Sequence, residues 1–241
     1  MIDEYVVLDL EMTGLSAKTD QVIEIGAVKI KNNQIIDTME CLVNPKCEIP
    51  TRVVELTGIT DEMVMQGRDK DAAIADLISF IDGYILVGQN INFDYSFLKQ
   101  WAVNHKMPLE VKACDTLKLA RVLLPAEQSK KLEALCEYFG IERTRGHRAM
   151  DDAIETWKIF EKLKELALEK GTSETYLEPR VLEYRAKKQS PATPRQVKQL
   201  KEYRENKQIF DEINWENLTK SEASRLIDKL LLNYGRVPYC H

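Results

Sequence analysis

The 241-residue chain lacks several features that would assign it to large classes of protein. No apolar run approaches the roughly 18 residues of a membrane-spanning helix, and the first residues show no signal-peptide pattern. We therefore expect a cytoplasmic protein with no membrane partner. The five cysteines are odd in number and form no C-x-x-C pair, which indicates free thiols and argues against a cysteine zinc site. Neither glycine-loop signature of dinucleotide or nucleoside-triphosphate binding occurs.

An excess of basic charge is also missing from most of the chain. The formal net charge is −5, and a hydrophobic content of 44% is ordinary for a globular protein. Residues 187–241 hold 11 Lys and Arg against 7 Asp and Glu, a charge of +4, which leaves −9 for residues 1–186. An acidic body with a basic tail does not coat nucleic acid along its whole surface, but it can still bind nucleic acid at a metal-charged cleft.

What the chain does contain is an alternation of apolar strands and amphipathic helices. Three early strands in hairpin succession are predicted, and shorter strands then alternate with helices, so we expect an α/β fold with a mixed sheet. The expected strands are the run that begins at Tyr5 and residues 21–30, 34–43, 85–87 and 112–116. The expected helices include residues 71–81, one capped by Asn92, and residues 117–123, 130–139 and 148–168.

The composition divides the chain into three predicted regions, which are a main domain over residues 1–170, a connecting segment over 171–192 and a small helical module over 193–241. Residues 169–186 have helical propensity but only a weak pattern, and residues 187–194 are a linker rich in Pro, Ser and Lys. Thr193 and Thr219 each begin a helix-capping pattern.

The role of the predicted module is open between three alternatives. Lys198, Lys201 and Arg204 recur at about one helical turn, which favours contact with DNA. Leu226 and Leu230 form part of an apolar stripe, which favours docking to a partner protein. The third alternative is a helical extension that packs on the body and has no function of its own.

Two acids at the end of the first strand indicate a candidate metal site. Asp9 and Glu11 are spaced by two, so both side chains lie on the same face of a strand. Two like charges at the end of a core strand repel each other and lose solvation, and a cation removes both costs. Taken alone, the triplet fits two ordinary surface acids equally well.

Two later acids and a histidine complete the candidate site. Asp94 lies in the first turn of a helix, and Asp152 lies at the start of the long helix, preceded by His147 in a loop. Each also fits a common role, as a helix-start acid or a surface histidine, and Asp151 and Glu24 are alternative acids. Together, four carboxylates from separate segments suit two divalent cations about 3.5–4 Å apart. Oxygen ligands without cysteine favour Mg²⁺ or Mn²⁺.

These residues lie in three segments that resemble the motifs of the DEDDh 3′–5′ exonucleases, a family that includes the proofreading epsilon subunit of bacterial DNA polymerase III. The segments are Asp9-x-Glu11-x-Thr13-Gly14-Leu15, Asn90-x-x-Phe93-Asp94 and His147-x-Ala149-x-x-Asp152. Residues 22–28 and 56–60 are also similar to family segments, so the resemblance runs from residue 4 to about 165. One departure is Gln89, where many members have a histidine, so a contact with the terminal nucleotide is expected to differ.

The resemblance implies a ribonuclease H-like fold with a mixed five-stranded sheet flanked by helices. It implies that Asp9, Glu11, Asp94 and Asp152 hold the two cations and that His147 is the general base. The residues implied to contact the terminal nucleotide are Met12, Thr13, Gly14, Leu15, Leu56, Asn90 and Phe93. Three arginines, Arg143, Arg145 and Arg148, are candidates for phosphate contact or else form a solvated basic loop.

The function that the resemblance implies is a metal-dependent 3′–5′ exonuclease that releases 5′-mononucleotides from single-stranded 3′ ends. DNA is the expected substrate, in proofreading or repair, with a DNA polymerase as a candidate partner. The motifs do not exclude an exoribonuclease that trims RNA. A non-catalytic module that binds nucleic-acid ends or a polymerase is a further alternative, but none of the implied catalytic residues is missing here.

Overall fold

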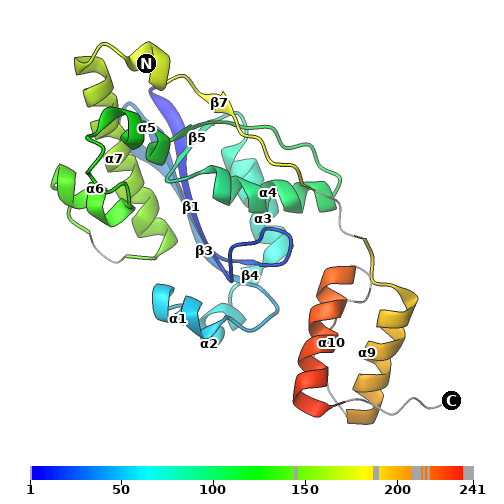
Figure 1. Ribbon diagram of the computed structural model, residues 1–241. Helices are drawn as coiled ribbons and strands as arrows, with labels where there is room; N and C mark the ends of the chain where they lie inside the picture. Colours follow the sequence, from blue (N-terminus) through cyan, green and yellow to red (C-terminus); the bar gives the residue numbers. More distant parts are fainter. Residues whose placement is uncertain are drawn as a thin grey trace. The chain divides into compact units, whose positions relative to one another are not determined.

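The chain forms two compact units, residues 1–186 and 187–241, and each is described by itself (Figure 1). The computed structural model describes residues 2–143, 146–186, 190–207, 213, 215 and 218–235. The predicted domain division, with boundaries at residues 170 and 192, stays a prediction.

A mixed sheet forms the centre of the first unit, with the strand order β4-β3-β2-β1-β5-β6-β7. The strands are β1 (Glu4–Met12), β2 (Val22–Lys31), β3 (Gln34–Asn44), β4 (Arg68–Asp69), β5 (Ile85–Gly88), β6 (Lys112–Asp115) and β7 (Arg180–Val181). β1, β2 and β3 are antiparallel neighbours, whereas β5 and β6 run parallel to β1. The predicted mixed sheet of five strands is confirmed, and the two-residue strands β4 and β7 extend it at its edges.

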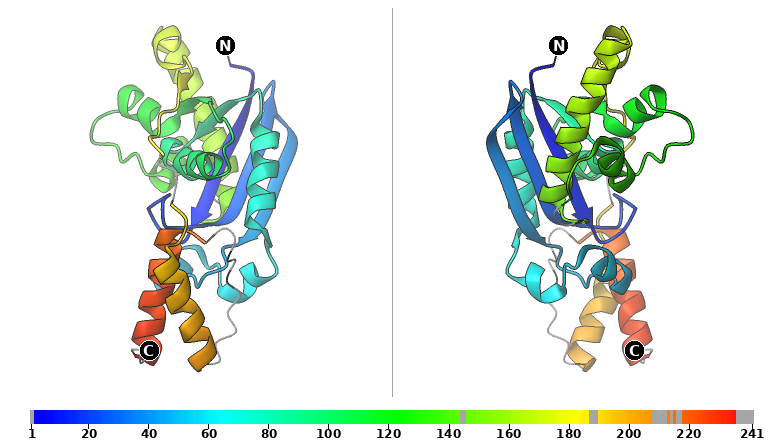
Figure 2. Two further views of the ribbon diagram at one scale, coloured as in Figure 1. Left: turned by 90° about the vertical axis from the view of Figure 1, so that its right-hand side faces the viewer. Right: turned by 90° about the vertical axis from the view of Figure 1, so that its left-hand side faces the viewer.

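Helices cover both faces of this sheet (Figure 2). The helices in the described part of this unit are α1 (Thr51–Thr57), α2 (Asp61–Met65), α3 (Lys70–Ile81), α4 (Asn92–Asn104), α5 (Thr116–Leu123), α6 (Leu132–Phe139), α7 (Ala149–Glu169) and α8 (Ser173–Tyr176), of which α1 and α2 lie at one end of the sheet (Figure 1). Val6 and Leu8 pack in one core with α3 and α4, whereas Tyr5 and Val7 pack in another with α5, α6 and α7. Because side chains alternate along a strand, Asp9 and Glu11 lie on the α7 face of β1.

One prediction about local structure is wrong, and one segment folds differently from its propensity. Asn92 is the first residue of α4 rather than its cap, because Asn90 takes a left-handed conformation (φ 63°) and its N–H binds Asp115 Oδ1 at 3.2 Å. Residues 169–186 are not one helix. They contain α8 and β7 instead, since pairing with the edge of β6 and the burial of Leu182 outweigh the helical propensity of the segment.

The second unit contains α9 (Pro194–Lys207) and α10 (Lys220–Tyr234). The predicted capping box is present, since Thr219 and the Glu222 side chain bond to each other's backbone. The unit has a core of its own, made by Leu200, Tyr203, Leu218, Ala223, Ile227 and Leu230. No helix in the described part of the chain is long and apolar enough to cross a membrane.

Candidate active site

The site is built at the end of β1, where β2 lies beside it in antiparallel register. Asp9 is paired with Gly26, and Glu11 is paired with Glu24. Both partners in β2 therefore lie next to the two acids, and the chemistry of the site depends on what packs against this part of the sheet.

The start of α7 docks directly on β2 at these two positions. Glu24 is 1% exposed and accepts hydrogen bonds from the Arg148 guanidinium, at 2.5–3.1 Å, and from the Ala149 N–H, at 2.9 Å. At Gly26, a Cβ atom would lie 2.1 Å from the Ala149 carbonyl carbon, so only glycine permits this approach. The pair of β2 residues thus sets where α7 begins.

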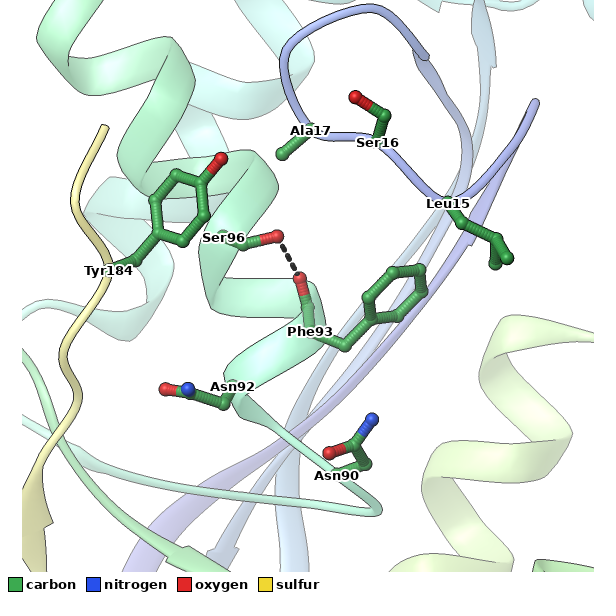
Figure 3. Close-up of a pocket in the computed structure, with 8 residues that line it drawn as sticks. All are labelled: Leu15, Ser16, Ala17, Asn90, Asn92, Phe93, Ser96 and Tyr184. Atoms are coloured by element: carbon green, nitrogen blue, oxygen red, sulfur yellow. Dashed lines mark hydrogen bonds between the residues drawn. The ribbon is translucent and has the colours of Figure 1, made fainter. Parts of the chain in front are cut away.

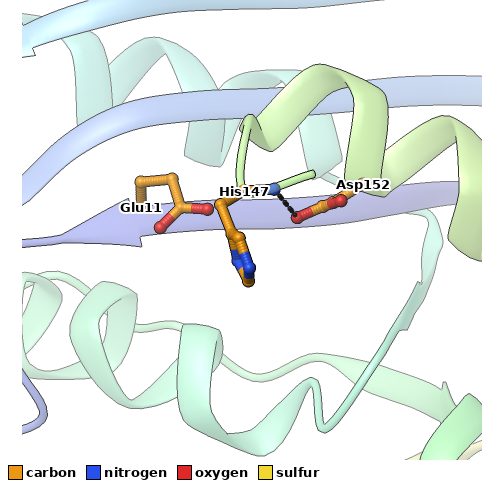
Figure 4. A group of neighbouring side chains, drawn as sticks. All are labelled: Glu11, His147 and Asp152. Carbon is orange, nitrogen blue, oxygen red and sulfur yellow. Dashed lines mark hydrogen bonds between the residues drawn. The ribbon is translucent and has the colours of Figure 1, made fainter. Parts of the chain in front are cut away.

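This docking brings Glu11, His147 and Asp152 together (Figure 4). Each offers one ligand atom, and these atoms all lie within 4.8 Å of one another. His147 lies before α7 with a left-handed backbone (φ 61°), and its N–H donates to Asp152 Oδ2 at 3.1 Å. The expected loop position of the histidine is therefore confirmed.

Asp94 and Asp9 lie beside this group, although their oxygens are not part of the 4.8 Å set. Asp94 is 4% exposed in the first turn of α4, and its Oδ1 accepts the Leu10 N–H at 3.0 Å. Burial and the charges of Asp94, Glu11 and Asp152 raise the pKa of Asp9 well above its usual value. The four predicted acids therefore act on one another electrostatically.

The other carboxyl groups are also harder to ionise than in water. Burial, followed by the charge of Asp152, raises the pKa of Glu11 to about 8. Burial raises the pKa of Asp94 to about 7, and burial together with the Glu155 charge raises that of Asp152 to about 6. Four carboxylates that resist ionisation in one place are a donor set that a divalent cation stabilises.

The two described candidate arginines are engaged in ion pairs with acids. Arg143 contacts Asp152 Oδ1 through Nη2 at 3.2 Å and Glu155 Oε2 through Nε at 2.9 Å. Arg148 is held by Glu24, as described above, and Arg145 lies outside the described residues. Both described arginines thus neutralise acids around the site, a role that local sequence pattern does not reveal.

The residues after β1 form a tight turn that ends at an exposed leucine. Thr13 is buried, and its Oγ1 accepts the Gln21 N–H at 3.0 Å. A Cβ atom on Gly14 would lie 2.5 Å from Asp20 Oδ2, so a larger residue here would displace the Asp20 carboxylate, which accepts the Ser16 N–H at 2.9 Å. Met12 is buried, whereas Leu15 is 78% exposed. Leu56 on α1 is likewise 55% exposed, and exposed apolar side chains of this size are available to contact a ligand.

The remaining predicted contacts of the terminal nucleotide, Asn90 and Phe93, lie at the junction of β5 and the first turn of α4. Phe93 is partly buried and makes an edge-to-face contact with Phe97, with ring centroids 5.6 Å apart. Gln89 is turned to the protein, since its amide donates to the Lys130 carbonyl oxygen at 2.7 Å. Asp115 accepts the Asn90 N–H and also caps α5. The sequence motifs do not identify it as part of the site, although its place before a predicted helix is typical of a capping acid.

Comparison of the sequence with known proteins gives a consistent set of relatives. A family described as Exonuclease, RNase_T, matches residues 6–160. The PolC-type DNA polymerase III of Caldanaerobacter subterraneus is 42% identical over 175 residues, which are 71% of this chain and 12% of that protein. The PolC-type enzyme of Bacillus subtilis is 41% identical over 174 residues, which are 70% of this chain and 12% of that protein. The chain thus matches about an eighth of the length of these relatives.

Two solved structures show the same fold as this chain at lower sequence identity. Exonuclease I of E. coli in complex with a dT13 oligonucleotide has a TM-score of 0.58 and 20% identity, covering 70% of this chain and 42% of that one. A 3′-exonuclease that recognises the histone mRNA stem-loop has a TM-score of 0.58 and 19% identity, covering 75% of this chain and 66% of that one. These likenesses confirm the predicted ribonuclease H-like fold.

Proposed function

The chain belongs to the exonuclease family that matches its residues 6–160, and on that premise we propose that it is a metal-dependent 3′–5′ exonuclease. It would release 5′-mononucleotides from the 3′ ends of DNA. The observation that carries this proposal is the convergence of Glu11, His147 and Asp152 within 4.8 Å, next to the buried Asp94.

The carboxylates fit divalent cations on the chemistry of their side chains. Asp9, Glu11, Asp94 and Asp152 would hold two such ions, Mg²⁺ or Mn²⁺, since hard cations prefer oxygen donors. The raised pKa values of these groups support this assignment, because a cation offsets the repulsion that burial intensifies. When bound, such ions supply Lewis-acid activation and neutralise charge on the reacting phosphate.

His147 would act as the general base. Imidazole accepts a proton near neutral pH, and the side chain is partly exposed at the site, within reach of a water molecule. The hydrogen bond from its backbone N–H to Asp152 holds the loop, so the ring stays beside the acids while it takes a proton from the attacking water.

The substrate would lie across the exposed side of this cluster. Thr13 and Gly14 would offer a close-fitting turn, with Met12 buried beneath it, and Leu15 and Leu56 would contact the bases with their exposed side chains. Asn90 and Phe93 would contribute from the start of α4. Apolar and aromatic contacts of this kind bind single strands with little dependence on sequence.

We propose DNA rather than RNA as the substrate because the relatives at about 40% identity are DNA polymerases. A role in proofreading or repair follows, in the bacterial cytoplasm and with a DNA polymerase as a partner. The structural likeness to an exonuclease that recognises an mRNA stem-loop favours RNA as the second candidate substrate.

The test is hydrolysis of 5′-labelled single- and double-stranded DNA and RNA by the purified chain, with Mg²⁺ or Mn²⁺ and with excess chelator. We expect stepwise shortening from the 3′ end of single-stranded DNA, and no reaction in chelator.

A matched pair of variants links this reaction to the site. Asp152→Asn should abolish hydrolysis, whereas Asp151→Asn, one residue earlier on α7 and outside the cluster, should retain it. Undiminished cleavage by Asp152→Asn, or cleavage in chelator, contradicts the metal-dependent mechanism.

A further inference from the structure

A pocket of about 500 Å³ lies between the loop after β1, the start of α4 and the chain segment after β7 (Figure 3). Its lining includes Leu15, Ser16, Asn90, Phe93, Ser96 and Tyr184. The family resemblance already implies that Phe93 contacts the 3′-terminal nucleotide. We propose that Tyr184 is a substrate-positioning residue, which forms the wall of this pocket opposite Phe93 and stacks on the base of that nucleotide. This inference rests on the proposed function and names a contact of the same site.

The chemistry of the lining selects a base rather than a phosphate. None of the described residues that line the pocket carries a charged side chain. Figure 3 shows the rings of Tyr184 and Phe93 on either side of Ser96, with side-chain amides and hydroxyls around them. Flat aromatic faces with neutral donors and acceptors at their edges suit a nucleobase, which stacks through its faces and makes hydrogen bonds through its edge.

The position of the pocket indicates which nucleotide it would hold. Leu15, Asn90 and Phe93 belong both to the pocket and to the predicted contacts of the terminal nucleotide. Phe93 directly precedes Asp94, one of the proposed cation ligands, so one wall of the pocket adjoins a residue of the proposed cation site. Tyr184 lies beyond residue 160, where the family match ends, and similarity to the family therefore does not assign it.

The backbone around Tyr184 is anchored before any substrate binds. Val181 in β7 pairs with Lys112 in β6, and the Leu182 N–H donates to the Val111 carbonyl oxygen at 2.9 Å. On the α4 side, Asn92 Nδ2 donates to the Glu183 carbonyl oxygen at 3.5 Å. The Tyr184 ring packs in part against the core beneath α4. A wall that is already in place costs little ordering when the base enters, which favours binding.

The first test compares variants on single-stranded oligothymidylate with Mg²⁺ or Mn²⁺. Tyr184→Ala should raise KM about tenfold, which is within the usual effect of losing one base–aromatic stack, and should change kcat far less. Tyr184→Phe keeps the ring and should behave like the parent. Tyr138→Ala, which removes a 48%-exposed ring on α6, is the matched control and should leave both constants unchanged.

The second test uses a strand that lacks only its 3′-terminal base. On this abasic strand, Tyr184→Ala and the parent should show the same KM, because there is no base to stack. Binding of both strands is also measured in chelator by fluorescence anisotropy, and the tenfold loss should appear there only for the complete strand.

These measurements separate the two proposals. A parent chain that hydrolyses neither DNA nor RNA with either cation refutes the proposed function, while the binding measurement still tests the pocket. If the parent is active and Tyr184→Ala matches it in KM and in binding, the base site is overturned and the exonuclease assignment stands. An equal loss on complete and abasic strands likewise overturns stacking on the terminal base.

Discussion

Replacing Gly26 with alanine tests whether the contact between β2 and α7 assembles the active site. The added Cβ would lie 2.1 Å from the Ala149 carbonyl carbon, whereas ordinary contact begins near 3.4 Å, so the backbones must separate by about 1.3 Å. β2 is paired on both sides, with β1 and β3, and so the start of α7 is the element that moves.

This displacement acts on the site through the residues next to Ala149. Asp152 lies three residues after it and His147 two residues before it, so both would shift relative to Glu11 on β1. A misplacement of about 1 Å at a reacting centre costs roughly 100-fold in rate. Crowding of this kind destabilises a fold by about 1–3 kcal/mol, less than the 5–15 kcal/mol that holds a typical domain together.

We therefore expect Gly26→Ala to fold, to lose a few degrees in Tm and to lose about 100-fold in kcat on single-stranded DNA. Circular dichroism gives Tm, and cleavage of a 5′-labelled strand gives kcat. Gly83→Ala is the control. Nothing lies within 4 Å of its Cβ position, but its φ of 78° makes alanine cost about 1 kcal/mol, so stability falls while kcat should not. A folded Gly26→Ala chain with kcat within threefold of the parent would refute the reasoning.

Three further predictions follow from the site and from the two units. His147→Ala should lower the rate about 10²–10⁴-fold with little change in substrate binding, and the acidic limb of the pH–rate profile should vanish or shift. Without metal, Tm should fall as pH rises from about 5 to 8. The folded chain holds protons on Asp152 (pKa about 6) and Glu11 (about 8) that the unfolded chain releases near 3.8 and 4.5, so deprotonation disfavours folding. Mg²⁺ or Mn²⁺ should restore Tm, and more so at higher pH. A chain ending at Ala186 should still cleave short oligonucleotides, because every proposed catalytic residue precedes that point.

Each of these predictions has an opposing result. An unchanged pH–rate profile in His147→Ala would point to another base. A metal-free Tm that rises between pH 5 and 8 would contradict the raised pKa values. Asp152 alone, with its pKa shifted by about two units, should cost on the order of 3 kcal/mol as it ionises, and roughly half of that cost falls above pH 5. If the second unit contacts phosphates, the shortened chain should bind long DNA more weakly and with less salt dependence. Identical affinity and salt slope would rule out that role.

The local pattern of the sequence was sufficient to predict most elements of the first unit. The period of two in β1 placed Asp9 and Glu11 on one face, and the helical period over residues 148–168 matches α7 closely. The local sequence pattern did not predict the structure where contacts with distant segments determine it. Residues 169–186 have helical propensity with only a weak pattern, but hydrogen bonding to the exposed edge of β6 forms β7 there, and no feature within the segment indicates that edge.

The sequence by itself also determined which residue types were available to the site, because three spaced motifs carry all the acids and the histidine. Only the tertiary structure decided how they are held together. Arg148 lies 124 residues from Glu24, and Gly26 faces a helix that begins 123 residues later, so their packing leaves no periodic trace along the chain. The same holds for Tyr184, which reaches the pocket only because β7 joins the sheet edge. Buried positions recur with the period of their own helix or strand, so they can be recognised in the local sequence. A contact between distant segments has no such period and depends on the geometry of the folded chain.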